Sequence, residues 1–240
     1  MTRVALIAGG ARGVGRACAI DLASRGWRVA VAWRSSADDA LTLAAALGGA
    51  HRVDRCDLED PDAREAWISA CERALGPADA LVYSAGPFHR AEVDQETDVG
   101  WRRCFEGNLH APRATALRVL PGMRARGWGR VVLFGMASSS RLAPPPALAA
   151  YHGAKAALTA WARAAAVSVA AEGVTVNVVA PGVIDTDGMD RAVFERVASR
   201  VPAGRAGRAE EVAAAVRFLV SDEAGYVNGA ELAVSGAWGL

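Results

Sequence analysis

Short apolar segments alternate along this chain with longer segments in which apolar residues recur at helical spacing. A strand followed by a helix and then by another strand is the unit from which parallel sheets are built. Because helices cover both faces of such a sheet, its strands are continuous apolar runs. The sequence therefore predicts an α/β fold with a doubly wound parallel sheet flanked by helices. Seven segments are predicted strands: residues 4–8, 28–33, 50–54, 80–83, 130–135, 174–179 and 231–234.

No linker divides the 240 residues, and this length suits one α/β domain. We therefore expect a single Rossmann-type domain over residues 1–240. Helical patterns cover residues 14–25, 37–47, 61–75, 97–126, 151–172 and 209–221. Substrate loops are expected near residues 87–97, 138–150 and 185–206, and their content of Pro, Ala, Leu, Met and Phe favours an apolar or ring-bearing substrate.

Charge and cysteine content exclude several classes of protein. The 27 basic and 26 acidic residues nearly cancel, which argues against a nucleic-acid partner. The four cysteines form no CxxC pair and have no metal-ligand spacing with the four histidines, so reduced thiols and no metal site are expected. The apolar run at residues 4–8 is too short for a signal peptide or a membrane span. These features indicate a cytoplasmic protein with no membrane partner.

The first predicted strand runs into a glycine-rich turn and then into a helix. Glycines in such a turn let the backbone approach a pyrophosphate at the N-terminus of the helix. A tight turn alone would explain the glycines equally well, but their position after the first strand favours dinucleotide binding. The predicted contacts are Gly9, Ala11, Arg12, Gly13, Val14 and Gly15.

The residues after the second predicted strand indicate which dinucleotide binds. NAD-binding proteins place a carboxylate there, which accepts a hydrogen bond from the ribose 2′-hydroxyl. This chain has Arg34 and Ser35 instead, and Arg12 lies in the glycine turn. Either arginine alone is equally consistent with a solvated surface charge. Together they can bind a 2′-phosphate, which favours NADP(H).

Tyr151 and Lys155 are four residues apart in a predicted helix and therefore lie on one helix face. Lys155 is the only lysine in the chain. An ammonium beside a phenol favours the phenolate, so we expect the pKa of Tyr151 to be lowered toward neutrality. A phenol of that kind is suited to donate a proton to a carbonyl oxygen.

In this order, the motifs resemble the short-chain dehydrogenase/reductase family, and their pattern is similar to that of 3-oxoacyl-carrier-protein reductases. The resemblance covers essentially the whole chain. Beyond the glycine turn and the Tyr151/Lys155 pair, it includes Asp57, Ala85-Gly86, Asn108, the segment 176–182 and the C-terminal stretches 202–205 and 210–213.

The resemblance implies a role for each matching residue. Tyr151 would be the general acid, Lys155 would hold the nicotinamide ribose and tune Tyr151, and Asn108 would position a water in the proton path. Cofactor contacts are implied for Asp57, Leu58, Ser84, Ala85, Gly86, Pro181, Gly182, Val183, Ile184 and Thr186. A homotetramer is also implied, formed partly by the helices at residues 97–126 and 151–172.

Two positions depart from the family's pattern. Ser84 stands where the family has an Asn that supports the sheet centre, so we expect lost hydrogen bonding there. The family's carbonyl-polarising Ser follows the fifth strand, and reading forward along that strand places Met136 there. Counting back from Tyr151 gives Ser138, which lies 13 residues before it, the family's usual separation.

The choice between Met136 and Ser138 stays open from the sequence. Insertions are tolerated better in a loop than inside a buried strand, which favours Met136 as the structural counterpart. Ser138, or its neighbours Ser139 and Ser140, can still reach a substrate oxygen from the longer loop. Otherwise the site works without that hydroxyl.

The sequence thus predicts an NADPH-dependent reductase that transfers hydride to a ketone or a related C=O or C=N group of a small substrate. One alternative is an NADP-dependent dehydrogenase that works toward the ketone. The other is an NADP-binding sensor or non-redox catalyst that has lost redox chemistry, and Met136 keeps that alternative open.

Overall fold

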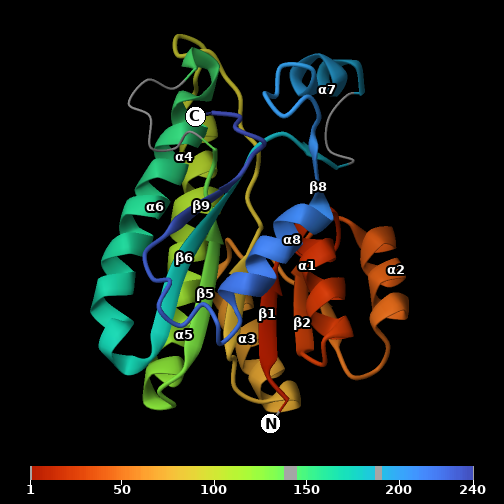
Figure 1. The fold of residues 1–240 in the computed structure, drawn as a ribbon, viewed down its shortest axis with the longest axis vertical. Helices are drawn as coiled ribbons and strands as arrows, with labels where there is room; N and C mark the ends of the chain where they lie inside the picture. Colours follow the sequence, from red (N-terminus) through yellow and green to blue (C-terminus); the bar gives the residue numbers. More distant parts are fainter. Residues whose placement is uncertain (1, 138–144, 187–190, 240) are drawn as a thin grey trace.

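The computed structural model describes residues 2–137, 145–186 and 191–239. A seven-stranded sheet in the order β3-β2-β1-β4-β5-β6-β9 forms its centre, and all neighbouring strands are parallel (Figure 1). This confirms the predicted doubly wound fold. The strands are β1 (Val4–Ala8), β2 (Arg28–Trp33), β3 (Arg52–Arg55), β4 (Ala80–Tyr83), β5 (Gly129–Phe134), β6 (Val174–Pro181) and β9 (Glu231–Val234).

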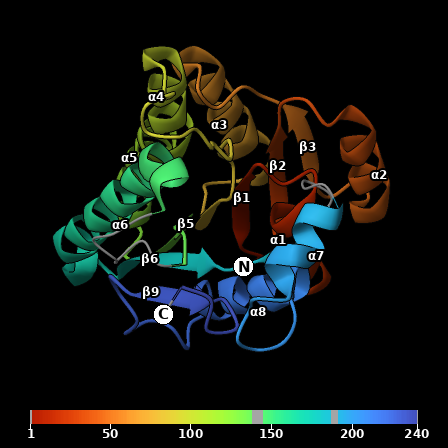
Figure 2. The same cartoon turned by 90° about the horizontal axis from the view of Figure 1, so that it is seen from above.

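Helices cover both faces of the sheet, because successive side chains of each strand point to opposite faces (Figure 2). Leu6 of β1 belongs to the buried cluster formed with α3, α5 and α6, whereas Ile7 belongs to the cluster formed with α1, α2 and α8. Two separate apolar layers therefore hold the sheet. The helices are α1 (Gly13–Ser24), α2 (Ala37–Leu47), α3 (Pro61–Leu75), α4 (Asp98–Phe105), α5 (Ala111–Ala125), α6 (Ala149–Val169), α7 (Arg191–Ala198) and α8 (Ala209–Leu219).

The helix predicted over residues 97–126 is confirmed, and within it a π-helical turn at Glu106–His110 lies between α4 and α5. The N–H of Ala111 donates to the carbonyl of Glu106, five residues back. Pro112 has no N–H to donate to the carbonyl of Asn108, four residues back, so the α-helical ladder is interrupted at Asn108. The interruption lies at a residue that the sequence analysis had singled out.

Three short elements near the carboxyl ends of the strands were not predicted: two strands and one helix. A two-stranded parallel sheet pairs β7 (Ile184–Asp185) with β8 (Gly207–Arg208), and α7 lies between these strands in the sequence. Strands of two residues are too short to show a periodic pattern.

The strand order reverses direction between β1 and β4, since the chain continues from β1 to β2 on one side and places β4 on the other. In open α/β sheets, ligands bind at such a point, beyond the carboxyl ends of the strands. The glycine turn follows β1 and the segment with Ala85 follows β4, so both lie at this switch point.

Candidate active site

The glycine turn between β1 and α1 lies against the ends of two neighbouring strands. The N–H of Gly9 donates to the carbonyl of Ala32 in β2, at 3.0 Å. Gly9 has a φ of +81°, and a Cβ there would lie 2.7 Å from Ala85. A Cβ at Gly15 would overlap the carbonyl oxygen of Gly9. The turn can pack this closely only because glycine occupies both positions. Without side chains at these positions, a ligand can approach the main chain of the turn.

Helix α1 begins beside this turn without a side-chain cap. Its N-cap residue, Arg12, is extended and its side chain makes no capping hydrogen bond. The first N–H groups of a helix have no partner within the helix, and together with the helix dipole they favour an anion. The bare turn and the uncapped helix therefore fit a pyrophosphate group. Of the other residues predicted around it, Ala11 is buried and Val14 is half-buried.

The segment after β6 reaches over the same turn. The N–H of Gly182 donates to the carbonyl of Val234 in β9, at 3.0 Å. A Cβ at Gly13 would lie 3.4 Å from Cγ2 of Thr186, so Thr186 contacts the start of α1. The structure thus brings Thr186 to the glycine turn, whereas Pro181 and Gly182 lie against β9 and its end, and Val183 and Ile184 lie against β8.

Arg34 and Asp57 follow β2 and β3, which are neighbours in the sheet. Nη1 of Arg34 lies 3.0 Å from Oε1 of Glu59 and 3.4 Å from Oδ1 of Asp57. Burial lowers the pKa of Arg34, but the charges of Glu59 and then Asp57 outweigh it, so the pKa is raised. Arg12 and Ser35 are exposed. Sequence reasoning missed Glu59, although its place after a strand end was a signal.

Ser84 makes the contact that we expected to be lost. Its Oγ donates to the carbonyl of Ala8 at 2.9 Å, and its backbone N–H donates to the same carbonyl. The expectation was wrong because the hydroxyl of Ser84 reaches the end of β1 directly. Leu58, also predicted to bind the cofactor, is buried, at 6% exposure.

Asn108 lies buried in the π-helical turn, behind Gly86. Its Nδ2 donates to the carbonyls of Pro87 and Cys104, both at 3.0 Å. Its Oδ1 has no hydrogen-bond partner in the described part of the chain. Gly86 has a φ of +151°, and a Cβ there would overlap this oxygen. Asn108 is therefore fixed in position by its amide nitrogen and by glycine packing.

Tyr151 and Lys155 lie on one side of α6, as their spacing predicts. Nζ of Lys155 lies 5.6 Å from the centre of the Tyr151 ring and donates to the carbonyl of Phe134 in β5, at 2.8 Å. Ala150 and Ala154 of α6 pack on Cys104 of α4, and Tyr151 packs against this small cluster. This packing places Tyr151 beside the segment that carries Asn108.

Phe88 is a further residue at Tyr151 that sequence reasoning missed. Its ring packs edge-on against Tyr151, with 5.2 Å between ring centres. Its side chain is nevertheless 63% exposed. The loop that carries it is held by the hydrogen bond between His89 and Glu96, whose Nε2 and Oε2 lie 2.7 Å apart. Its place two residues after Gly86 was the available signal.

The pKa of Tyr151 is shifted against the expectation from the sequence. Burial, and then the Cys104 thiol, raise the pKa of Tyr151 to about 12. Burial lowers the pKa of Lys155 to about 8, although Cys104 acts in the opposite direction. Forming the phenolate is unfavourable in this buried place, and the Lys155 ammonium, which binds the Phe134 carbonyl, does not offset that cost. Tyr151 is therefore protonated at neutral pH.

The lowered pKa of Lys155 predicts a pH-dependent contribution to stability. Unfolded lysine keeps its proton up to about pH 10.5, whereas Lys155 in the folded chain loses it near pH 8. Between these values the unfolded chain binds more protons, so this residue makes the free energy of unfolding rise with pH. Urea unfolding of wild type and Lys155→Met at pH 7.5 and 9.5 measures it.

The expected difference between the two proteins is on the order of 1 kcal/mol per pH unit, with wild type gaining relative to the variant. Buried cysteines such as Cys18, with a pKa raised to about 12 by burial, act in the opposite direction in both proteins. The comparison removes their effect. Identical pH dependence in the two proteins would show that Lys155 titrates normally.

The chain after β5 follows β6 without an extra residue. The N–H of Gly135 donates to the carbonyl of Val179 at 2.8 Å, and the N–H of Ala137 donates to that of Pro181 at 3.2 Å. Met136 is half-buried between them. This regular pairing agrees with the alignment that places Met136 directly after the strand. Ser138, Ser139 and Ser140 lie outside the described residues.

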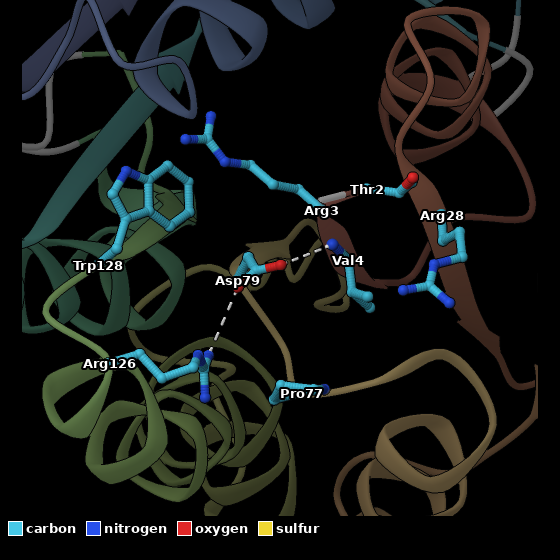
Figure 3. A pocket seen from close by; sticks show the side chains of 8 residues that line it. All are labelled: Thr2, Arg3, Val4, Arg28, Pro77, Asp79, Arg126 and Trp128. Carbon is cyan, nitrogen blue, oxygen red and sulfur yellow. Dashed lines mark hydrogen bonds and ion pairs between the residues drawn. The ribbon is translucent and has the colours of Figure 1, made fainter.

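A cavity of about 750 Å³ lies at the opposite, amino ends of the strands (Figure 3). Two of its arginines are already paired: Arg126 with Asp79 at 3.7 Å, and Arg3 with Asp222 at 2.7 Å. Arg3 also lies over the Trp128 ring, 3.9 Å from its centre. Because ligands of this sheet type bind at the carboxyl ends, we place the active site at the switch point and not in this cavity.

The described residues, 2–137, 145–186 and 191–239, hold neither a membrane-spanning helix nor a metal-binding cluster. No helix in these ranges has the length and apolar content needed to cross a bilayer. No three His, Cys, Asp or Glu side chains gather there as a metal-binding group. The four cysteines are buried and form no disulfide.

Comparison with known proteins extends the resemblance to the whole chain. The family model described as Enoyl-(Acyl carrier protein) reductase matches residues 9–238. The acetoacetyl-CoA reductase of Shinella zoogloeoides is 35% identical over an alignment of 240 positions, which covers 98% of this chain and 98% of its own. The 3-oxoacyl-[acyl-carrier-protein] reductase FabG of Escherichia coli is 35% identical over 98% of this chain and 96% of its own.

A solved structure shows the same fold. The actinorhodin polyketide ketoreductase, crystallised with NADPH, has a TM-score of 0.91 and 29% identity, and the match covers 99% of this chain and 97% of that one. The family model, the identity to reductases along nearly the full length and the shared fold agree with the order of motifs in the sequence. The chain belongs to the short-chain dehydrogenase/reductase family of oxidoreductases.

Proposed function

We propose that this protein is an NADPH-dependent reductase of a ketone or a related C=O or C=N group, acting on a small apolar or ring-bearing substrate. The observation that carries the proposal is the placement of Tyr151 and Lys155 on one face of α6, beside buried Asn108 and at the carboxyl ends of the strands. Relatives that reduce acetoacetyl-CoA or 3-oxoacyl groups support it.

Separate groups of residues bind separate parts of NADPH. The glycine turn and the start of α1 bind the pyrophosphate, and Arg34 with Arg12 binds the 2′-phosphate. Asp57 and Leu58 lie at the adenine end, and Ser84, Ala85 and Gly86 lie along the ribose. Pro181, Gly182, Val183, Ile184 and Thr186 bind the nicotinamide end. A bound NADPH supplies the hydride that the substrate carbon accepts.

Tyr151 donates the proton. As negative charge develops on the substrate oxygen, the Oη proton of Tyr151 is transferred to it, and the raised pKa keeps that proton available at neutral pH. Lys155 holds the nicotinamide ribose. Asn108 positions a water from which Tyr151 regains its proton. Ser138 polarises the substrate oxygen from the loop after β5.

A redox-inactive NADP-binding protein is the second candidate, and one observation favours it. The regular pairing of β5 with β6 supports the alignment in which Met136, a thioether, stands at the position of the family's hydroxyl donor. A thioether cannot donate a hydrogen bond to a carbonyl oxygen. Oxidation of NADPH by the purified protein with any member of a ketone and quinone panel separates the candidates. If the protein oxidises an alcohol with NADP+ but reduces no member of the panel with NADPH, it is a dehydrogenase that works toward the ketone.

Cofactor preference is the first expected result. NADPH should bind at least tenfold more tightly than NADH, a difference of about 1.4 kcal/mol, because only NADPH brings a phosphate to Arg34. Arg34→Asp should reverse the order, since a carboxylate repels the phosphate and accepts from the 2′-hydroxyl. Titration of nucleotide fluorescence measures all four affinities. Equal affinities of wild type for the two dinucleotides would contradict the assignment.

We also expect a homotetramer in the cytoplasm, formed partly through α4, α5 and α6. These helices expose large apolar side chains: Val99, Trp101, Leu117 and Val167. Apolar groups on neighbouring helices are typical of a subunit interface. Light scattering at micromolar concentration should give four times the 24.9 kDa chain mass. A monomer under those conditions would refute the assembly.

A further inference from the structure

Arg34, which we assign to the 2′-phosphate, already forms ion pairs with two carboxylates. Trp33 of β2 pairs with Arg55 of β3, so the residues that follow these two strands lie side by side. In the described chain, Nη1 of Arg34 lies within ion-pair distance of both Glu59 and Asp57. An incoming phosphate needs the N–H donors of the same guanidinium.

Of the two carboxylates, Glu59 lies nearer to Arg34 and is less exposed. Its oxygen is nearer to Arg34, at 3.0 Å against 3.4 Å for Asp57, and its side chain is 24% exposed against 46%. Oδ1 of Asp57 accepts from the backbone N–H of Glu59 at 3.1 Å, which fixes the turn between them. A Cβ at Gly107 would lie 3.0 Å from Oε1 of Glu59, so the carboxylate also lies against the turn that carries Asn108.

The local charge is unfavourable for a second anion. Arg34 contributes one positive charge, and Glu59 with Asp57 contributes two negative charges. With Arg55, whose Nε donates to the carbonyl of Arg34 at 3.3 Å, these four charges sum to zero, and Arg12, assigned to the same phosphate, adds one positive charge. A 2′-phosphate would meet two carboxylates of like charge at the guanidinium that binds it, whereas a 2′-hydroxyl brings no charge. The penalty therefore falls on NADPH and not on NADH.

We propose that Glu59 is a specificity-determining residue that competes with the 2′-phosphate for Arg34 and so limits the preference for NADPH. This rests on the proposed function, because it takes NADPH as the cofactor. In the free chain Glu59 holds Arg34 in its ion pair. When NADPH binds, Arg34 exchanges this carboxylate for the phosphate, and Glu59 is left beside an anion. Removing the charge of Glu59 while keeping its shape should strengthen binding of the phosphorylated dinucleotide alone.

The test measures binding and needs no turnover. Wild type and Glu59→Gln are titrated by calorimetry with NADPH, with NADH and with adenosine 2′,5′-bisphosphate, which carries the phosphate without the nicotinamide. In Glu59→Gln we expect the affinity for NADPH and for the bisphosphate to rise at least about fivefold, with a change of less than about twofold for NADH. Glu59→Ala should shift the affinities in the same direction, and replaces Glu59→Gln if that variant does not fold.

Glu65→Gln is the matched control. Glu65 is a carboxylate of α3 that pairs with an arginine elsewhere, with Oε2 at 2.7 Å from Nε of Arg118. Its removal changes the net charge by the same amount but should leave all three affinities unchanged. If the affinity for the phosphorylated ligands rises equally in Glu65→Gln, the effect comes from the net charge of the protein, and the proposal is overturned.

The remaining outcomes separate this inference from the function on which it rests. If wild type prefers NADPH but Glu59→Gln binds it equally or more weakly, then Glu59 orients Arg34 or plays no part, and the inference alone is overturned. If wild type binds neither NADPH nor the bisphosphate, the proposed cofactor is wrong and the inference falls with it. A selective gain for the two phosphorylated ligands supports the exchange of Glu59 for the phosphate.

Discussion

Replacing Tyr151 with phenylalanine is expected to lower kcat by about 10³ while leaving the affinity for NADPH within about threefold of wild type. The hydroxyl is needed only in the transition state, when the substrate oxygen takes a proton, so its loss should not weaken binding of the cofactor. Steady-state reduction of the best ketone in a panel gives kcat, and titration of nucleotide fluorescence gives the affinity.

Tyr226 offers a matched control, because its side chain is fully exposed and lies in the turn after α8. Tyr226→Phe makes the same chemical change and should leave both quantities at wild-type values. A Tyr151→Phe enzyme with unchanged kcat would end the assignment of Tyr151 as the proton donor.

Ser138→Ala is expected to lower kcat by about 10² to 10³, the usual loss when one hydrogen-bond donor to a developing oxyanion is removed. The reason is that Met136, two residues after β5, has no proton to donate, and Ser138 is the serine at the family's usual separation from Tyr151. Affinity for NADPH should not change, because the donor acts on the substrate. The same kinetic assay measures it, and Ser139→Ala and Ser140→Ala test the two neighbouring serines as alternative donors.

A loss of less than about tenfold in Ser138→Ala would show that Ser138 does not polarise the substrate. Met136→Ser then becomes the informative variant. A gain in kcat on simple ketones would mean that the site normally works without a hydroxyl at this place.

The fold was predictable where burial dictates the pattern. Strands β1, β2 and β4 begin and end at the predicted residues, because strands of a covered parallel sheet are continuous apolar runs between turn residues. The edge strand β9 also has the predicted bounds, although it is only partly buried. The division of the helix at residues 97–126 was not recognised. Pro112 lies in the interior of that helix, where its missing N–H interrupts the hydrogen-bond ladder, but the sequence does not show that the interruption takes the form of a π-helical turn, which the bond from Ala111 to Glu106 defines.

The candidate site was predictable where a motif fixes the backbone, and less so where side chains interact across strands. The glycine turn and the i, i+4 pair of Tyr151 and Lys155 follow from local geometry. The raised pKa of Tyr151 depends on burial, which the sequence does not quantify. The pairing of Arg34 with Glu59 joins residues 25 apart and depends on the register of β2 with β3.

The transfer of hydride itself tests the account most directly. Purified wild type is incubated with NADPH that carries two deuterium atoms at C4 of the nicotinamide, together with a panel of ketones, and the products are analysed by mass spectrometry. We predict an alcohol that carries one deuterium on the former carbonyl carbon, formed far more slowly by Tyr151→Phe. NADPH that binds tightly but stays unoxidised with every member of the panel would contradict the account and favour the redox-inactive alternative.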